Sequence, residues 1–190
     1  MVADQNSLKV SKYFLLIIFT ILFTSKSYSN NYSLSKIVEL DEPWGSSFIN
    51  KDEIIVTEKG GKIKIVNINS KKISEVKHNL NFLDIGQGGL LDIIHQNNNL
   101  WISYTEDRGN WKTSTSIAKA KLDKKKLNFE NIFQANPPID SGYHFGSRLA
   151  IKGDYLFASA GERGQGMIAQ DATKHPGSII RIHTDGRIPK

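Results

Sequence analysis

The chain has 190 residues, 23% of them charged, with a formal net charge of +6 and no cysteine. This length predicts a single domain, and the lack of cysteine excludes disulfide bonds and thiolate metal sites within it. The densest positive cluster, DKKKL at 123–127, stands between two apolar alternations and predicts a solvated hairpin turn. No aromatic residues are interleaved with these lysines, so we expect no nucleic-acid partner.

The first 29 residues have the pattern of a secretory signal peptide. A short basic region precedes the apolar run Tyr13 to Thr24, and small residues follow at Ser27 and Ser29. As a helix this run spans about 18 Å, less than a hydrocarbon core of roughly 30 Å. Residues 1–29 are therefore predicted to be cleaved, giving an exported protein, periplasmic or secreted, with no stable membrane span. An uncleaved membrane anchor is the alternative.

From residue 30 onward the apolar residues recur with a period of two, which predicts β-strands. Turn formers such as EKGGK, HQNNN and TDGR separate the runs, and Asp185-Gly186 predicts a hairpin turn. No stretch shows a helical stripe, so the sequence predicts an all-β meander. The runs of strand length are 36–40, 53–58, 62–68, 99–106, 115–122, 155–161 and 178–184.

An internal repeat makes this prediction more specific. The stretches SSFINKDEIIVTEKG, LDIIHQNNNLWISYTED and LAIKGDYLFASAGER each contain an apolar strand, a polar turn and a second strand. Their second strands begin near Ile54, Leu100 and Tyr155, offsets of 46 and 55 residues. This spacing favours β-propeller blades over a β-sandwich. Residues 30–190 hold about three such units, and propellers close with roughly four to eight, so we expect a partial propeller truncated at its C-terminal end.

Two polar residues flanked by glycine are candidates for a site. Gln87 lies in DIGQGGLLDIIH and His144 lies in SGYHFGSRL, each just ahead of an expected inner strand. Small neighbours allow a ligand to approach the backbone closely. The residues alone leave open whether these side chains meet a ligand or only cap the backbone. The five histidines never fall at a local metal-ligand spacing, so no metal site is predicted.

Five stretches, in order, resemble the glucose/sorbosone dehydrogenase family of soluble aldose sugar dehydrogenases that depend on pyrroloquinoline quinone (PQQ). They are EPWGSSFINKDEIIVTEKGGKIKIV, GQGGLLDI, LWISYTE, SGYHFGSRLAI and AGERGQGMIAQDATKHPGSIIRIHTDGRIP, within about Val38 to Pro189. The resemblance implies a six-bladed β-propeller of which this chain is the N-terminal half, about three blades. Alone, the chain is then expected to be inactive.

The resemblance also implies a mechanism. His144 would be the general base that removes the proton of an aldose's anomeric hydroxyl while hydride passes to the quinone, and Gln87 would contact the sugar. The cofactors would be PQQ and Ca²⁺, whose ligands are expected beyond residue 190. No cofactor-binding or metal-binding residue is therefore assigned within the chain, and the electron acceptor is unknown.

Tyr143 departs from the family pattern, because the family's glucose dehydrogenases carry an aspartate there that orients the histidine. This departure implies a broader range of sugars and leaves the group that orients His144 unidentified. Arg148, Arg163 and Gln170 match the pattern too, with a blade-packing or hairpin-stabilising role expected. The alternative function is a non-catalytic exported propeller that binds carbohydrate or protein.

Overall fold

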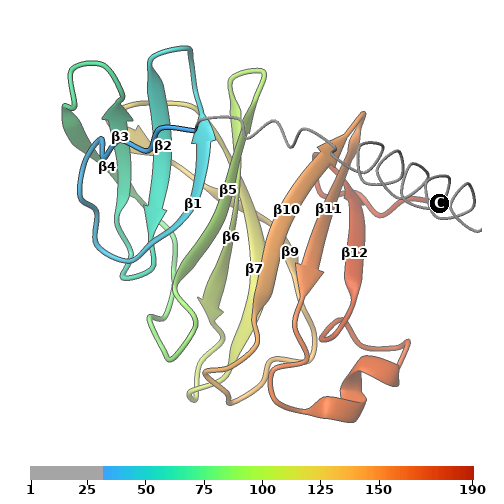
Figure 1. Ribbon diagram of the computed structural model, residues 1–190. Coiled ribbons are helices and arrows are strands. Elements are labelled where there is room, and N and C mark those ends of the chain that lie inside the picture. The colour runs from blue at the N-terminus through green and yellow to red at the C-terminus, as the bar shows by residue number, and fades with distance from the viewer. Residues whose placement is uncertain (1–31) are drawn as a thin grey trace, which may run out of the picture. The chain divides into compact units, whose positions relative to one another are not determined.

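The computed structural model describes residues 32–190, and residues 37–190 form one compact unit of three β-sheets (Figure 1). The predicted signal peptide, 1–29, lies outside the described residues. The single helical element in the described part is a short 3₁₀-helix, η1 (Gly166–Gln170). The prediction of an all-β fold is confirmed.

Each sheet corresponds to one predicted repeat and is called a blade below. In each blade, consecutive strands pair antiparallel. The second strands β2, β6 and β11 contain or begin at the positions that anchored the repeat. Blade 1 contains β1 (Pro43–Phe48), β2 (Glu53–Glu58), β3 (Ile63–Asn67) and β4 (Ile73–His78); blade 2 contains β5 (Leu90–Gln96), β6 (Asn99–Asp107), β7 (Thr113–Lys121) and β9 (Glu130–Gln134); blade 3 contains β10 (Gly146–Lys152), β11 (Tyr155–Ala160) and β12 (Ile179–His183).

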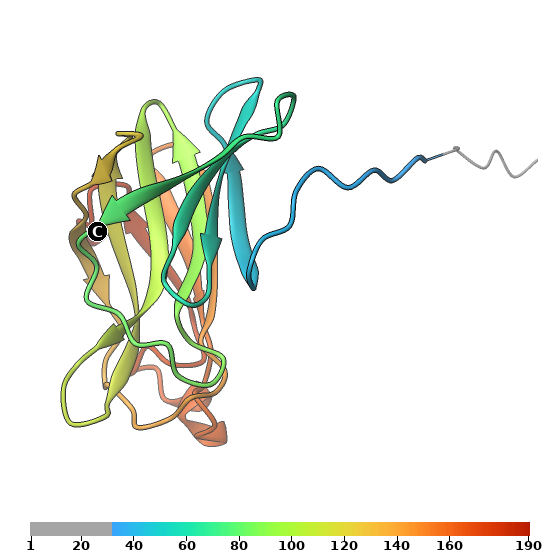
Figure 2. The ribbon, with the colours of Figure 1, turned by 90° about the vertical axis from the view of Figure 1, so that its left-hand side faces the viewer.

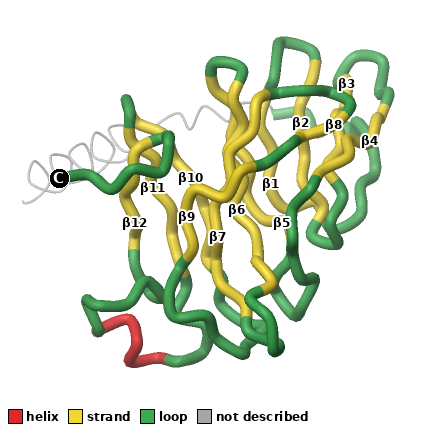
Figure 3. The backbone as a smooth tube through the Cα atoms, turned by 180° about the vertical axis from the view of Figure 1, so that it is seen from behind, coloured by secondary structure: helices red, strands yellow, loops and turns green. Residues whose placement is uncertain are grey.

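Two local predictions are wrong. Residues 36–40 form no strand and are mostly exposed, so no buried face selects their alternation. The cluster at 123–127 is solvated but does not turn back as a hairpin. Instead β8 (Lys126–Leu127) pairs in parallel with the end of β4. Figure 3 shows both strands, labelled, from behind. Burial of Leu127 in the core between blades 1 and 2 explains this excursion before β9 returns to β7.

Blade 2 is covered on both faces. Along β6, Leu100, Ile102 and Tyr104 pack toward blade 1, whereas Trp101 belongs to the apolar core shared with blade 3. Successive strand residues point to opposite faces, so alternate positions serve the two cores. Seen from the side of blade 1, the sheets lie one behind another (Figure 2). This packing places the first strands, β1, β5 and β10, next to one another.

A hydroxyl residue recurs at one position of the second strand in every blade. Its oxygen accepts a backbone N–H from the first strand of the same blade, at 3.0 Å in all three cases. The side-chain bond therefore replaces a ladder hydrogen bond at the irregularity where the register of each first strand shifts. The pairs are Thr57 with Gly45, Ser103 with Asp92, and Ser159 with Arg148.

Two of these hydroxyls also reach the next blade. Thr57 Oγ1 donates to the carbonyl of Leu91 at 2.5 Å, and Ser103 Oγ donates to the carbonyl of Ser147 at 2.6 Å. Both hydroxyl residues are fully buried. A buried carbonyl without a partner is costly, so each hydroxyl fixes the spacing between neighbouring first strands.

Replacing Ser103 with alanine is expected to lower the free energy of unfolding by about 1–3 kcal/mol, because a buried N–H and a buried carbonyl lose their partner. Denaturant unfolding of the whole gene product measures this loss. The matched control is Ser70→Ala, at an exposed turn, which should change stability by less than about 0.5 kcal/mol. Equal stability of the two variants would contradict a bridging role for Ser103.

Candidate active site

Three loops lie at one end of the sheets: the loops that lead into β5 and β10, and the segment with η1 that follows β11 (Figure 1, bottom). The adjacency of β5 and β10 brings the first two loops together. Gln87 and His144, the two candidate site residues, occupy these loops, just before β5 and β10 respectively. Both are exposed.

Hydrogen bonds join the two loops directly. The backbone N–H of His144 donates to Gln87 Oε1 at 2.9 Å, and the N–H of Gln87 donates to the carbonyl of Gly142 at 2.8 Å. A side chain at Gly86 would place its Cβ 2.5 Å from that carbonyl oxygen, so glycine is required for the approach. The structure thus brings the two candidates together, with Gln87 holding the backbone of His144. Contact between Gln87 and a sugar stays a prediction.

The imidazole of His144 is paired with a carboxylate. His144 Nδ1 lies 2.5 Å from Glu162 Oε1, with about half of the histidine side chain exposed. This hydrogen bond is the main cause that holds the pKa of Glu162 below its usual value. Because a carboxylate only accepts hydrogen bonds, a neutral His144 carries its proton on Nδ1 and keeps the lone pair on Nε2. Nε2 can then accept a proton from a ligand.

Glu162 is the functional residue that sequence reasoning missed. It supplies the orienting contact that Tyr143 left unexplained, although it lies 18 residues from His144 in the sequence. A sequence pattern could have indicated Glu162 as a site residue. It follows β11 in AGERGQG and is a polar residue among glycines, like Gln87 and His144. Glu162 differs from them in that its loop leaves a second strand instead of entering a first strand.

The backbone around His144 has an unusual conformation. His144 has a φ of +50° and is followed by Gly146 at +71° and Ser147 at +85°. Non-glycine residues in this region cost roughly 1–3 kcal/mol each and persist only where the surroundings impose them. One constraint is Gly161, where a Cβ would lie 1.9 Å from the carbonyl oxygen of His144.

The other residues that matched the family pattern lie nearby in different settings. Arg148 Nη1 bonds to Asp92 Oδ1 at 3.0 Å, joining the first strands of blades 2 and 3. Gln170 ends η1 and is exposed. Arg163 is almost fully buried under the His144 loop.

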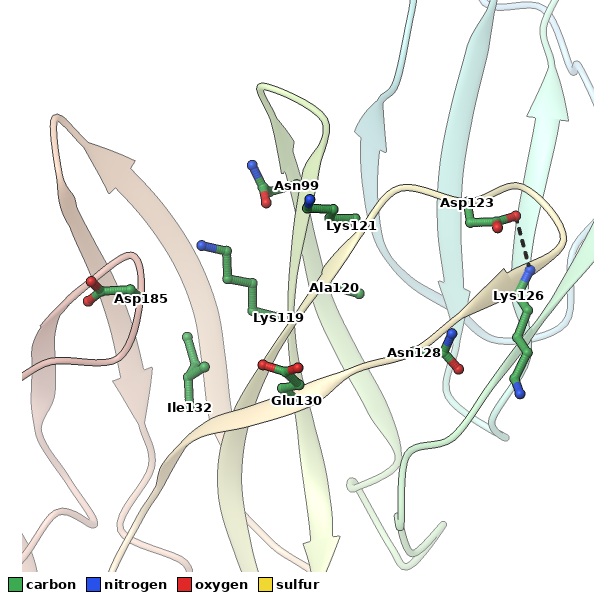
Figure 4. A pocket seen from close by; sticks show the side chains of 10 residues that line it. All are labelled: Asn99, Lys119, Ala120, Lys121, Asp123, Lys126, Asn128, Glu130, Ile132 and Asp185. Atoms are coloured by element: carbon green, nitrogen blue, oxygen red, sulfur yellow. Dashed lines mark hydrogen bonds between the residues drawn. The ribbon is translucent and has the colours of Figure 1, made fainter.

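A separate groove, with a volume of about 560 Å³, lies along β7 and the 122–130 segment (Figure 4). It is lined by three lysines and three carboxylates, including Lys119, Glu130 and Asp185. Neither Gln87 nor His144 lines it. Within residues 32–190, no group of three or more His, Asp or Glu side chains is arranged to hold a metal ion. In the same residues, no helix is long and apolar enough to cross a membrane.

The model of the Glucose / Sorbosone dehydrogenase family matches residues 40–190, most of the chain. The chain belongs to this family. The predicted resemblance is thereby confirmed over both glycine-rich loops and the Glu162 segment, which all lie inside the matched range.

Individual relatives agree with the family match. The chain is 30% identical over 161 residues to the aldose sugar dehydrogenase YliI of Escherichia coli, covering 80% of this chain and 43% of that protein. A glucose dehydrogenase crystal structure superposes with a TM-score of 0.78 at 27% identity, covering 83% and 49%. The PQQ-bound aldose sugar dehydrogenase of Streptomyces coelicolor, 22% identical, shares the fold with a TM-score of 0.72, covering 82% and 48%. The chain spans about half the length of these relatives.

Replacing Gly161 with alanine is expected to displace the His144 loop, because the new methyl group would overlap the carbonyl of His144. We expect a loss of about 1–3 kcal/mol in the free energy of unfolding. The control is Gly60→Ala, whose Cβ would meet only the end of the Asp84 side chain at 3.7 Å. Thermal and denaturant unfolding compare the two variants, and equal effects would refute the close contact.

The Glu162–His144 pair predicts a pH dependence. The folded-state pKa of Glu162 lies below its ordinary value of 4.5, so its stabilising contribution is complete above that pH and is lost as pH falls through the lowered pKa. The melting temperature of the wild type should exceed that of Glu162→Gln at pH 6, with the difference shrinking toward pH 3. A difference that grows as the pH falls would contradict the pairing.

Proposed function

We propose that the protein is an exported aldose sugar dehydrogenase that uses PQQ and oxidises the sugar at its anomeric carbon. One observation carries this proposal: in a chain of the glucose/sorbosone dehydrogenase family, His144 is held by Gln87 through its backbone and by Glu162 through Nδ1 of its ring, with about half of its side chain exposed. The E. coli relative, named an aldose sugar dehydrogenase, supports the reaction class.

The role of each residue follows from the hydrogen bonds. Nε2 of His144 accepts the proton of the anomeric hydroxyl as the carbonyl of the lactone forms. Positive charge then develops on the imidazole, and the carboxylate of Glu162, 2.5 Å from Nδ1, stabilises it. Gln87 keeps the loop in place through the N–H of His144, and its remaining amide N–H groups can bond a sugar hydroxyl.

PQQ, when bound, would supply the acceptor for the hydride that leaves the sugar. PQQ is proposed here because the S. coelicolor relative is described in its PQQ-bound form. We assign no residue of this chain to the quinone. Residues 32–190 offer no cluster fit for Ca²⁺, so no step above depends on calcium.

The surroundings of the base favour a site open to several aldoses. Tyr143, 61% exposed, presents its ring edge-on to His144 with the ring centroids 6.2 Å apart. An exposed aromatic face beside the base offers apolar contact to a sugar ring without selecting one pattern of hydroxyls. We therefore propose a broad range of aldose substrates and leave the electron acceptor unassigned.

Substituting His144 by alanine is expected to lower kcat by about 10²–10⁴-fold, because the hydroxyl proton loses its acceptor. The whole gene product, loaded with PQQ and Ca²⁺, is assayed with aldoses and an artificial electron acceptor. His183→Ala is the matched control, since His183 stacks on Tyr155 at the far end of blade 3.

Full activity in His144→Ala would remove the base from the mechanism. A folded wild-type protein that binds sugar but gives no turnover with PQQ and Ca²⁺ would favour the non-catalytic binding module instead. A melting temperature of His144→Ala no lower than that of Glu162→Gln, which loses the same ion pair, would show that the effect on kcat does not come from unfolding.

A further inference from the structure

We propose that Arg163 is the positioning residue for His144: its guanidinium fastens the loop 141–145 to the start of β7 and thereby fixes the base. The inference rests on the proposed function for its catalytic consequence. Its structural part, that Arg163 holds this loop, stands on contacts alone.

The guanidinium bonds to two separate segments. Nε donates to the carbonyl of Tyr143 at 2.9 Å, and Nη2 donates to the carbonyl of Ser141, so both bonds hold the loop just ahead of His144. Nη1 and Nη2 donate to the backbone carbonyl and the hydroxyl of Thr113, at 3.2 and 2.7 Å. Thr113 begins β7 of blade 2. Arg163 therefore ties the loop of blade 3 to a strand of blade 2.

Stacking adds a third connection. The Arg163 guanidinium lies 3.6 Å from the ring centroid of Phe145, the residue that follows His144. The same ring fills the space beside Gly88, where a Cβ would be 2.7 Å from it. Gly88 neighbours Gln87, so the stack reaches both glycine-rich loops.

Burying the charged guanidinium of Arg163 costs free energy. Its exposure is 2%, and burial lowers its pKa to about 10. All four of its acceptors are neutral oxygens, which compensate buried charge less well than a carboxylate would. An apolar side chain would fill this space without the desolvation penalty of a buried charge. Only arginine combines a planar face for Phe145 with a fork of donors that can reach Ser141, Tyr143 and Thr113 together.

The loop needs such a fastening. His144 has a left-handed backbone conformation, which relaxes unless its neighbours over-determine it. Gln87 holds the loop at the N–H of His144, whereas Arg163 holds it on either side, at Tyr143 and Phe145. Displacing the imidazole by about 1 Å can cost on the order of 10²-fold in rate.

The test compares Arg163→Met and Arg163→Lys with the wild type in the whole gene product. Amide hydrogen exchange, followed by mass spectrometry, reports the loop without any need for cofactor. We expect exchange in 141–145 to rise about 10- to 100-fold in Arg163→Met, and exchange in 149–158 of β10 and β11 to stay within about threefold. Arg163→Lys should give an intermediate rise, because an ammonium keeps the charge but loses the fork and the stack.

Arg181→Met is the matched control, because Arg181 also lies over an aromatic ring, that of Tyr155 at 5.2 Å, but is exposed on β12. It should leave exchange in 141–145 unchanged. In the PQQ-loaded enzyme, Arg163→Met should lower kcat about 10- to 100-fold and raise KM by a smaller factor, since the base is misplaced while Gln87, on the other loop, keeps its proposed sugar contact.

Unchanged exchange in 141–145, or an equal rise throughout blade 3, would overturn the proposal by showing no special hold on the loop. Should Arg163→Met not fold, the Arg163→Lys measurement decides. A wild-type protein without quinone-dependent turnover would refute the proposed function, yet the exchange result would still decide whether Arg163 holds the loop.

Discussion

The buried hydroxyls of Thr57 and Ser103 set the constraint on which the rest of this structure depends. Each bonds to the first strand of its own blade and to the first strand of the next. Two neighbouring first strands are thereby held at the distance of one side chain. The loops that enter β5 and β10 therefore lie side by side, and glycine at positions 86 and 142 lets their backbones come into contact. The site is a consequence of blade packing.

His144 is then held from two blades at once. Its ring is oriented by Glu162, which follows β11 in the same blade, whereas its backbone N–H is held by Gln87 from blade 2. Glu162 thus sets the orientation of the His144 ring, and Gln87 sets the position of its backbone. A change in the angle between blades 2 and 3 would move the N–H contact but not the ring contact, so the histidine could keep its tautomer while losing its place.

The strand pattern was predictable wherever a side-chain alternation met a sheet edge. The doubly buried β6 is an example, because Leu100 and Trp101 face different apolar cores. Two features were not predictable from pattern. Residues 36–40 alternate but form no strand, and Leu127 leaves its blade to fill a core beside blade 1. The burial of Leu127 depends on a contact between blades, which local periodicity does not record.

The candidate site likewise contains residues that the sequence pattern predicted and residues that it did not. Gln87 and His144 were visible because glycine marks each loop, and the family resemblance gave His144 its proposed role as general base. Glu162 and the burial of Arg163 were hidden, because the relevant neighbour of His144 is a loop 18 residues away rather than the adjacent residue. Once Glu162 orients the imidazole, position 143 no longer has to carry a carboxylate. A tyrosine there accepts a hydrogen bond from Arg163 through its carbonyl and places its exposed ring beside His144, so the surface next to the imidazole is aromatic while its support from Glu162 is kept.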